Sequence, residues 1–598
     1  MAVFLAAGTT ATLMFGAGGG AFAQGTTTIS YAGGWQTNGI VNPVGMGNVI
    51  QNPLAYSALA IYKYTGAYDY WPLLAKSWKI TNHGNQVTVY LNPDAKWSNG
   101  TPVTANDVYV TFEIQFMFGN PQSWGLTGMK VLNPHTIVFY KNPHFLYNTA
   151  VLLQQILNNN VILPAADFQQ FIPANLWQVV KQESGNPKLK SVQQAQQQMG
   201  KWTATIQGHN FTSGSNLLYD GPWEFQNWSS SQELYTKNPD FLFANHVNAD
   251  QVMVINQTTN DVTWRALANG TVDFTSVAFS PPVYNAVIGK HGNQFVAAPL
   301  SAGVSLLFNE NIYPYNMPQV RQALAYMINR QGAWKIGLPV GSKLMTILDG
   351  MTATANHQWL TQAQLNSLNP YSYDPAKGAA LLESVGFKKT SQGWIMPNGK
   401  PFTMNIYAPQ FTAWDAAIQG ITGQLTSLGI KASPIVVNTS TFYSSQGRSS
   451  GKYAVAMRWW GGWNMNPANT YNQIFIGDNN FRVGNQGQLI PNPPPNPLGV
   501  PLGFKIPGFG WVQPESLAIK LDGNLPAATE KQYVLKLAKA YNYWLPAIPI
   551  WNNVAGHTFS TQNWVWPAFQ HNPALLNQFT HTLPFVVYQI LGLMKPKQ

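Results

Sequence analysis

The stretch AKWSNGTPVTANDV, residues 95–108, decides the fold class that we predict for this chain. The residues before it, 86–91 (QVTVYL), alternate between polar and apolar side chains in the manner of a strand. The dipeptide Asn99-Gly100 tolerates the positive φ of a tight turn. Thr104 stands three residues before Asp107, the spacing of a helix N-cap, and apolar residues follow. We therefore predict a strand, a turn and then a helix.

Several further segments along the chain contain short, recognisable sequence motifs in a fixed order. They are DGPW (220–223), LLFN (306–309), VRQALAYMINR (320–330), YDPAK with LLE and GF (373–387) and LPAIPI (545–550). Together with residues 95–108 they resemble the extracellular solute-binding proteins that serve ABC importers of the oligopeptide, dipeptide and nickel type. Asn329 stands where that family usually has an aspartate. Apolar residues at helical spacing predict a helix over 320–330, and Asp374 followed by Pro375 predicts a second, capped helix over 374–387.

The resemblance implies an α/β chain with a two-lobed periplasmic-binding-protein-like fold (type II) and an extra subdomain inserted in lobe I. The length agrees, because single cores stop growing at about 250 to 300 residues and this chain has 598. Strand-like and helix-like patterns also mix throughout the sequence. The expected boundaries are a signal peptide at 1–24, lobe I at 25–62, 206–300 and 545–598, the inserted subdomain at 63–205, and lobe II at 301–544.

The first 24 residues are apolar, rich in Ala and Gly, and end in an A-x-A-like cleavage pattern at Ala21-Phe22-Ala23. We therefore expect a secreted protein that is periplasmic or associated with the cell surface. The chain contains no cysteine. This composition excludes disulfides, thiolate metal sites, a cysteine nucleophile and a lipid-modified cysteine after the signal.

Charged residues are scarce: only 9% of the chain is Asp, Glu, Lys or Arg, against about 25% in ordinary proteins. The 33 basic residues outnumber the 22 acidic ones. Carboxylates that must stay ionised weaken a fold in strong acid, so we favour a secreted protein of an acidophile. A cationic chain could instead bind polyanions. Its basic residues form no runs of five or six and its aromatic residues do not alternate with lysine clusters, so we expect no nucleic-acid partner.

Enzyme motifs are weak. GRSSG (447–451) matches G-x-S-x-G, but a polar loop precedes Ser449 where that motif requires a strand. Asp107 and Glu113 could be offered as the acid pair of a glycan-active hydrolase, but both lie on one predicted helix. The ten histidines lack metal-ligand spacing. We therefore expect no catalytic residues, no metal and no cofactor, and keep the secreted hydrolase as the alternative.

The segment RWWGGWNMNP (458–467) resembles the family's ligand-contact segment. When it is aligned on Pro467, the two aspartates of the family pattern fall on Trp463 and Asn466. Peptide-binding members usually use the first of these to receive the peptide's α-amino group, because a desolvated ammonium needs a counter-charge. Indole faces and amides suit a polyhydroxylated ligand instead. We therefore favour an oligosaccharide slightly over an oligopeptide, with other solutes such as nickel complexes still open.

These patterns and the family positions single out a set of candidate ligand contacts. They are Trp35, Trp124, Asn309, Trp460, Trp463, Asn464 and Asn466. The resemblance places Trp35 where a first strand enters the cleft and Asn309 at the crossing between lobes. We expect Trp459 in the core and Arg321 in a structural ion pair. The expected partners are a small-molecule ligand and a membrane ABC permease, with the receptor itself a monomer.

Overall fold

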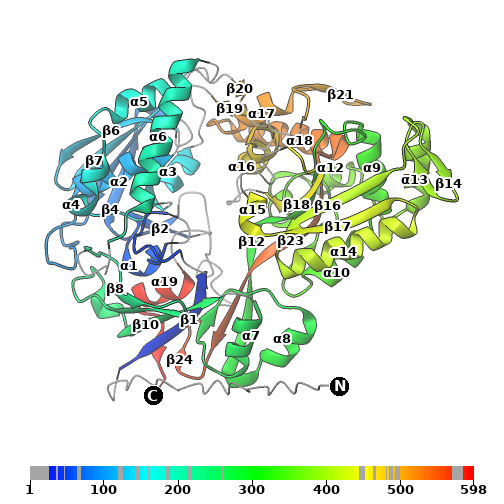
Figure 1. Ribbon diagram of the computed structural model, residues 1–598. Helices are drawn as coiled ribbons and strands as arrows, with labels where there is room; N and C mark the ends of the chain where they lie inside the picture. The colour runs from blue at the N-terminus through cyan, green and yellow to red at the C-terminus, as the bar shows by residue number, and fades with distance from the viewer. Residues whose placement is uncertain are drawn as a thin grey trace, which may run out of the picture.

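The computed structural model describes residues 26–35, 38–45, 48–63, 69–118, 125–142, 149–158, 160–183, 189–211, 217–257, 260–443, 451–461, 467–477, 479, 481–483, 489–491, 499–568 and 583–597. The chain forms two lobes, with an additional subdomain stacked on lobe I (Figure 1). Helices and strands mix in both lobes. The predicted two-lobed α/β architecture with an inserted subdomain is confirmed.

One sheet runs through both lobes. Within the described residues it has eleven strands, in the order β17-β16-β18-β12-β23-β11-β1-β10-β9-β8, with β13 attached to β23. The long antiparallel strands β12 (Asn293–Phe308) and β23 (Ala547–Ser560) belong to both halves. Their register is regular at both ends and shifts between Pro299 and Gly303 and between Val304 and Ser305. The lobes are therefore joined by a two-strand ladder whose pairing is interrupted between them.

Gly303 occupies the interrupted part of this ladder, where another backbone approaches closely. It pairs with Trp460 on one side and with Asn552 on the other. A Cβ atom added at Gly303 would lie 2.3 Å from the Trp551 carbonyl oxygen and 2.7 Å from Nε1 of Trp460. A side chain therefore cannot enter this position unless the two strands move apart.

Lobe I contains the half of the sheet formed by β11, β1, β10, β9 and β8, and α7 and α8 lie beside it (Figure 1). Its described elements are β1 (Thr28–Trp35), α1 (Asn52–Ala55), β2 (Ala60–Tyr62), β8 (Trp223–Trp228), β9 (Gln232–Lys237), β10 (Gln251–Gln257), α7 (Asn260–Ala268), β11 (Phe274–Thr275), α8 (Pro281–Val287), β24 (Trp564–Val565), α19 (Pro584–Ile590) and β25 (Lys595–Pro596).

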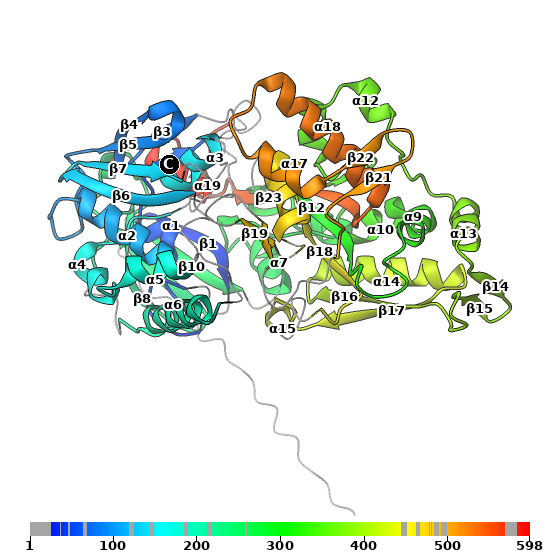
Figure 2. The same ribbon diagram turned by 90° about the horizontal axis from the view of Figure 1, so that it is seen from above.

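The inserted subdomain has its own four-stranded sheet, in the order β4-β5-β7-β6, with helices against it (Figure 2). Its described elements are β3 (Tyr70–Pro72), β4 (Ala75–Thr81), β5 (Gln86–Leu91), α2 (Ala105–Phe118), β6 (Leu126–Asn133), β7 (Thr136–Lys141), α3 (Thr149–Leu157), α4 (Ala165–Phe168), α5 (Leu176–Glu183) and α6 (Lys190–Gly208).

Lobe II packs helices on both faces of β16, β17 and β18 (Figure 1). Its described elements are α9 (Pro318–Met327), α10 (Arg330–Gly337), β13 (Lys343–Leu344), α11 (Ala353–Trp359), α12 (Gln362–Asn366), α13 (Pro375–Ser384), β14 (Lys388–Thr390), β15 (Gly393–Ile395), β16 (Thr403–Pro409), α14 (Thr412–Ser427), β17 (Lys431–Val437), α15 (Thr439–Tyr443), β18 (Val455–Trp460), α16 (Pro467–Asn472), a π-helix (Gln473–Gly477), β19 (Phe481–Val483), β20 (Leu489–Pro491), β21 (Phe504–Ile506), β22 (Gly510–Val512), α17 (Pro514–Leu521) and α18 (Ala527–Trp544).

Each lobe has its own hydrophobic core. One core is continuous through lobe I and the inserted subdomain, a second fills lobe II, and a small one lies under α7 and α8. Residues 545–551 of β23 and the turn before it pack in the second core. The domain boundaries expected from the sequence stay a proposal. No helix in the described part of the chain is both long and apolar enough to span a bilayer.

Local sequence signals explain most of the element boundaries. The strand predicted at 86–91 and the turn at Gly100, where φ is +79°, are both present. Asp374 accepts a hydrogen bond from the Lys377 N–H at 3.0 Å and so caps α13, as predicted. The helix expected over 320–330 instead breaks after Met327, because the Asn329 side chain caps a new helix, α10, by accepting from the Gly332 N–H.

The cap at Thr104 differs in chemistry from the predicted one. The Thr104 hydroxyl and N–H both donate to the Asp107 carboxylate, at 2.8 and 2.7 Å, so the acid is the acceptor. The other oxygen of Asp107 accepts from the Ala165 N–H at 2.8 Å. This residue therefore fixes the start of α2 and also holds α4 against it.

Buried carboxyl groups are paired mainly with neutral donors. Glu233, Asp349 and Glu310 are at most 5% exposed, and burial raises the pKa of each to about 7. The Tyr235 hydroxyl donates to Glu233 at 3.0 Å, and the Met351 N–H donates to Asp349 at 2.9 Å. Among the described residues, every carboxyl whose pKa departs clearly from its ordinary value is shifted upward. Glu233, Asp349 and Glu310 therefore take up protons when the chain folds near neutral pH.

We predict that the protein is more stable at pH 4 than at pH 8. A carboxyl whose pKa is raised by folding binds its proton more tightly in the folded state, so acid favours folding. For Glu233, Glu310 and Asp349 this stabilisation is complete below the ordinary pKa of about 4 and is lost as the pH rises through about 7. Urea unfolding should give a free energy at least about 2 kcal/mol larger at pH 4. A larger value at pH 8 would contradict this reasoning.

We predict that Gly303→Ala destabilises the protein by about 1 to 3 kcal/mol, because the added methyl group would overlap the Trp551 carbonyl. Gly200→Ala is the matched control: Gly200 lies inside α6, and nothing lies within 4 Å of an added Cβ. That change should stabilise the protein by about 0.5 to 1 kcal/mol, because alanine favours helix. Chemical denaturation of both variants checks this, and equal effects at the two sites would show that the ladder is not tightly packed at Gly303.

Candidate functional site

Two strands, one from each lobe, run toward the interrupted part of the ladder and end there. In lobe I, β1 is parallel to β11, and β11 is antiparallel to β23, so β1 advances toward the lobe boundary and ends at Trp35. In lobe II, β18 is antiparallel to β12 and ends at Trp460, opposite Gly303. The topology therefore brings two of the predicted ligand contacts to the boundary from opposite lobes.

Trp460 lies on this boundary but is almost wholly covered. Its side chain is 2% exposed, and its ring lies over Gly303. Within the described part of the chain, its buried Nε1–H has no hydrogen-bond acceptor. A buried donor without an acceptor carries a desolvation cost of about 1 to 3 kcal/mol, so an acceptor brought to this place would be bound favourably. Trp460 stays a predicted contact.

The two faces of β18 differ in their surroundings. Trp459 points to α14 and packs edge-on against Trp414, with 5.3 Å between ring centroids. It is half-buried and packs against the lobe II core, where we expected it to lie within the core. Arg458 precedes Trp459 in β18 and so lies on the opposite face of the strand, where it is 5% exposed. The side-chain oxygen of Gln473 accepts from Nη2 of Arg458 at 3.2 Å, while its amide nitrogen donates to the Gly461 carbonyl at 2.8 Å. The start of the predicted ligand segment is thereby held against the π-helix.

Several predicted contacts lie where the structure gives no side-chain position. Trp124, Trp463, Asn464 and Asn466 lie outside the described residues, and of Trp35 the backbone is described. The segment that contains Trp463 leaves β18 at the lobe boundary and returns at Pro467, the first residue of α16. The described residues on either side of it, Gly461 and Pro467, both belong to lobe II.

Asn309 is not at the crossing between the lobes. It follows Phe308, the lobe II end of β12, whereas the interrupted pairing begins at Pro299. Its amide nitrogen donates to the Gly451 carbonyl at 2.9 Å, and its side-chain oxygen accepts from the Asn311 N–H at 3.0 Å. The expected location was therefore wrong, because β12 continues well into lobe II. A ligand role for Asn309 stays a prediction, which these two hydrogen bonds do not favour.

Asp107 and Glu113, the carboxylates considered for a hydrolase, each hold part of the subdomain. Asp107 anchors the start of α2 and α4, and Glu113 accepts from Nε1 of Trp177 at 2.9 Å. Both are buried. Within the described residues, no three His, Asp or Glu side chains are grouped so that they could hold a metal ion. These positions therefore supply structural contacts.

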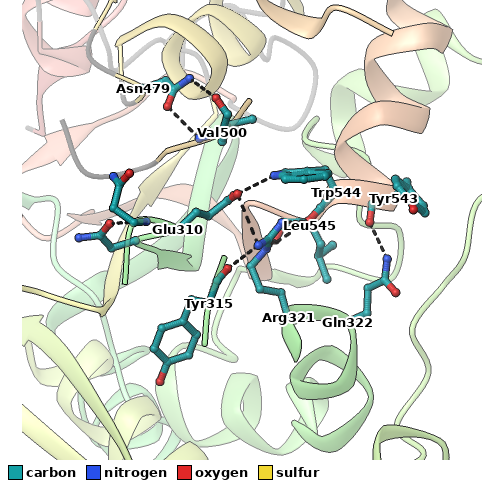
Figure 3. Close-up of polar contacts among 11 residues, drawn as sticks. Glu310, Tyr315, Arg321, Gln322, Asn479, Val500, Tyr543, Trp544 and Leu545 are labelled. Carbon is teal, nitrogen blue, oxygen red and sulfur yellow. Dashed lines mark hydrogen bonds and ion pairs between the residues drawn. The ribbon is translucent and has the colours of Figure 1, made fainter. Parts of the chain in front are cut away.

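A buried cation fixes the place where β12 ends and β23 begins (Figure 3). The Arg321 guanidinium pairs with Glu310 at 3.4 Å. It also donates to the carbonyl groups of Tyr315, Trp544 and Leu545. Nε1 of Trp544 donates to the same oxygen of Glu310 at 2.7 Å. The predicted ion pair of Arg321 is confirmed. The spacing of residues in the sequence does not predict that Glu310 and Trp544 are its neighbours.

Ionisation in this network follows from its burial. The side chains of Arg321 and Glu310 are 0% and 2% exposed. Desolvation raises the pKa of Glu310 to about 7, although Arg321 and the Trp544 indole favour the ionised form. Desolvation likewise lowers the pKa of Arg321, against the opposing effect of Glu310. The carbonyl acceptors therefore contribute much of what holds the guanidinium in place.

We predict that Arg321→Ala destabilises lobe II by about 3 to 5 kcal/mol, because it removes the counter-charge of the buried Glu310 and leaves the Tyr315 and Leu545 carbonyl groups without their guanidinium donor. Glu310→Gln should cost less than half as much, because the carbonyl acceptors of Arg321 remain. Urea denaturation of both variants makes the comparison. Equal losses would mean that the ion pair, and not the carbonyl acceptors, dominates the network.

Comparison with known sequences places the chain among solute-binding proteins. Residues 69–482 match the family described as bacterial extracellular solute-binding proteins, family 5 Middle. The glutathione-binding protein GsiB of Salmonella paratyphi A is 27% identical over 222 residues, which cover 37% of this chain and 39% of that protein. The chain thus spans about two fifths of the length of the curated relatives it matches.

Solved structures share the fold over nearly the whole chain. The mannohexaose-bound periplasmic oligopeptide-binding protein of Thermotoga maritima has a TM-score of 0.70 at 20% identity, covering 96% of this chain and 100% of that one. AppA of Bacillus subtilis, in complex with a nonapeptide, gives 0.67 at 13% identity, with coverage of 96% and 100%. NikA of Brucella suis, with Fe(III)-EDTA, gives 0.68 at 15% identity, with coverage of 95% and 100%.

At these identities the structural likeness shows the fold alone, and it confirms the predicted type II periplasmic-binding-protein-like fold. The family match covers well over half of the chain. The chain belongs to the bacterial extracellular solute-binding proteins of family 5.

Proposed function

We propose that this protein is an extracellular receptor that captures a solute between its two lobes and delivers it to a membrane ABC importer, without covalent chemistry. The observation that carries the proposal is the β12–β23 ladder, which joins two separately packed lobes through a stretch of interrupted pairing. Such a connection lets the lobes rotate as bodies while their cores stay intact. The solute-binding family supports the same reading.

For the ligand, we propose an oligosaccharide in preference to an oligopeptide. The segment 458–467 contains no carboxylate to receive a peptide ammonium, and it is rich in indole and amide groups. The buried Nε1–H of Trp460 can donate to a hydroxyl or carbonyl oxygen. The fold does not choose between the classes, because relatives with this fold carry mannohexaose in one case and a nonapeptide in another. The preference therefore rests on the residues of this segment.

We further propose that the receptor works outside the cell at low pH. The raised pKa values of Glu233, Glu310 and Asp349 allow these groups to be buried as neutral acids there. In the described structure, ion pairs join Lys63 to Asp69 and Arg321 to Glu310, and when Glu310 is protonated Arg321 is still held by its carbonyl acceptors. Neutral donors replace most of the cations that carboxylates meet in ordinary proteins.

We predict that oligosaccharides raise the melting temperature at pH 4 more than peptides of similar length do. A ligand at 100 times its dissociation constant stabilises the folded state by about 2.7 kcal/mol. Thermal-shift measurements with cello-, malto-, xylo- and manno-oligosaccharides and with di- to hexapeptides check this. A shift with peptides alone would overturn the sugar preference, and no shift with either class would count against both ligand classes.

Two tryptophan variants locate the binding site. Trp463→Ala should abolish the shift caused by the sugar, because stacking on this indole is a main part of the proposed recognition. Trp511→Ala is the matched control: it also removes an indole from lobe II, but Trp511 is 67% exposed on β22, in the β21–β22 hairpin. Loss of the shift in both variants, or in neither, would contradict the proposed position of the site.

A further inference from the structure

The two lobes also touch at a second place, away from the crossing strands. Asn524 lies in the connection between α17 and α18 of lobe II, and Thr149 begins α3 in the subdomain. Nδ2 of Asn524 donates to the Thr149 hydroxyl at 2.8 Å. The Thr149 N–H donates to Oδ1 of Asn524 at 3.1 Å. Figure 2 shows α3 and the α17–α18 connection facing each other. One amide thus bridges the lobes with both of its polar atoms.

This bridge is a helix cap supplied from the other lobe. The first N–H groups of a helix have no acceptor within the helix itself, and a side-chain oxygen that accepts from one of them stabilises the helix start. For α3, Oδ1 of Asn524 accepts from the first of these groups. If the lobes moved apart, the Thr149 N–H would lose this acceptor.

Gly84 leaves room for the bridge. It has φ +87° in the turn after β4. A Cβ atom at this position would lie 2.9 Å from Oγ1 of Thr149 and 3.4 Å from Nδ2 of Asn524. The turn, the helix start and the amide therefore meet in close packing at one point.

Two ionisable groups, Asp522 and Lys141, flank the bridge. Asp522 is two residues before Asn524 and accepts from Nδ2 of Asn472. Lys141, at the end of β7 in the subdomain, lowers the pKa of Asp522, although burial raises it to about 8. Asp522 in turn favours the charged form of Lys141. Because Asp522 ionises only near pH 8, attraction between these groups would act across the lobe boundary in alkaline solution, whereas the Asn524–Thr149 hydrogen bonds do not depend on it.

The bridge is connected to the predicted ligand segment. Asn472, which donates to Asp522, is the last residue of α16. The first residue of that helix, Pro467, follows directly after the segment that contains Trp463. Helix α16 therefore runs from Pro467, the last residue of the predicted segment, to the contact of Asn472 with Asp522.

We propose that Asn524 and Thr149, flanked by Asp522 and Lys141, form a latch that holds the lobes in the arrangement described here, in which lobe II touches the subdomain and which we call closed. This inference rests on the proposed function, since closure matters only to a receptor that encloses its ligand. Asn524 and Thr149 are positioning residues in it: they act on the arrangement of the lobes and have no contact with ligand.

The absence of cysteine permits a direct test in the full chain. Gln197→Cys on α6 and Gln419→Cys on α14, both exposed, would carry a donor and an acceptor dye for single-molecule energy transfer without added ligand. In Asn524→Ala the ratio of closed to open molecules should fall about ten-fold, the factor that corresponds to the loss of about 1.4 kcal/mol for two hydrogen bonds. Thr149→Val removes one of the bonds and should act in the same direction with a smaller effect.

Asn398→Ala is the matched control, because Asn398 is an exposed turn residue whose amide accepts from the Lys400 N–H within its own lobe. It should leave the lobe distances unchanged. Amide hydrogen exchange supplies a second measurement: the Thr149 N–H should exchange faster in Asn524→Ala and at the parent rate in Asn398→Ala. If Asn524→Ala and the control show the same lobe distances and the same Thr149 exchange rate, the latch proposal is overturned.

This test separates the latch from the receptor function. Neither measurement uses a ligand, so a latch that fails while sugars or peptides still shift the melting temperature leaves the receptor proposal standing. Conversely, faster Thr149 exchange and wider lobe distances in Asn524→Ala support the latch even if no ligand in the screen binds.

Discussion

The antiparallel ladder of β12 and β23 is the constraint on which the rest of the structure depends. Both strands contribute to the sheet of each lobe, so the two cores are built on the same pair of strands and are separated by a short stretch of shifted pairing. In that stretch the Trp551 carbonyl and the Trp460 ring pack tightly against Gly303. Arg321 holds the lobe II ends of both strands in place. The rotation that we propose between the lobes would therefore be confined to a few residues, with little change in either core.

The scarcity of charge shapes how this framework is held together. Where ordinary proteins would pair carboxylates with cations, this chain buries carboxyl groups against hydroxyl and amide donors, as at Glu233 and Asp349. Amide side chains also carry tertiary contacts: Asn552 accepts from the Ala353 N–H and donates to the Ala302 carbonyl beside the interrupted ladder. Such contacts keep their strength in acid, because amides do not titrate there. The composition and the architecture therefore have one physical explanation.

Much of the fold could be predicted from the sequence because its signals are local. The alternation at 86–91, the turn at Gly100 and the cap at Asp374 each depend on residues that are neighbours in the chain. The break after Met327 was missed because Asn329 is compatible with a continuing helix until its side chain is seen to accept from Gly332.

The candidate site was less predictable because it depends on which strands cross and where. The family pattern indicated a segment near Trp460, but how far β12 extends into lobe II, and hence the position of Asn309, is a property of the sheet. The contact of Asn524 with Thr149 spans 375 positions. No local pattern marks such a pair, so only the folded chain could reveal it.

Small-angle X-ray scattering with and without the oligosaccharide or peptide that gives the largest thermal shift would test most directly whether the lobes close around a solute. If the ladder is a hinge, the radius of gyration should fall and the distribution of interatomic distances should narrow at saturating ligand, in proportion to occupancy. A scattering profile that stays unchanged at saturation would show that the solute binds without closure and would contradict capture between the lobes.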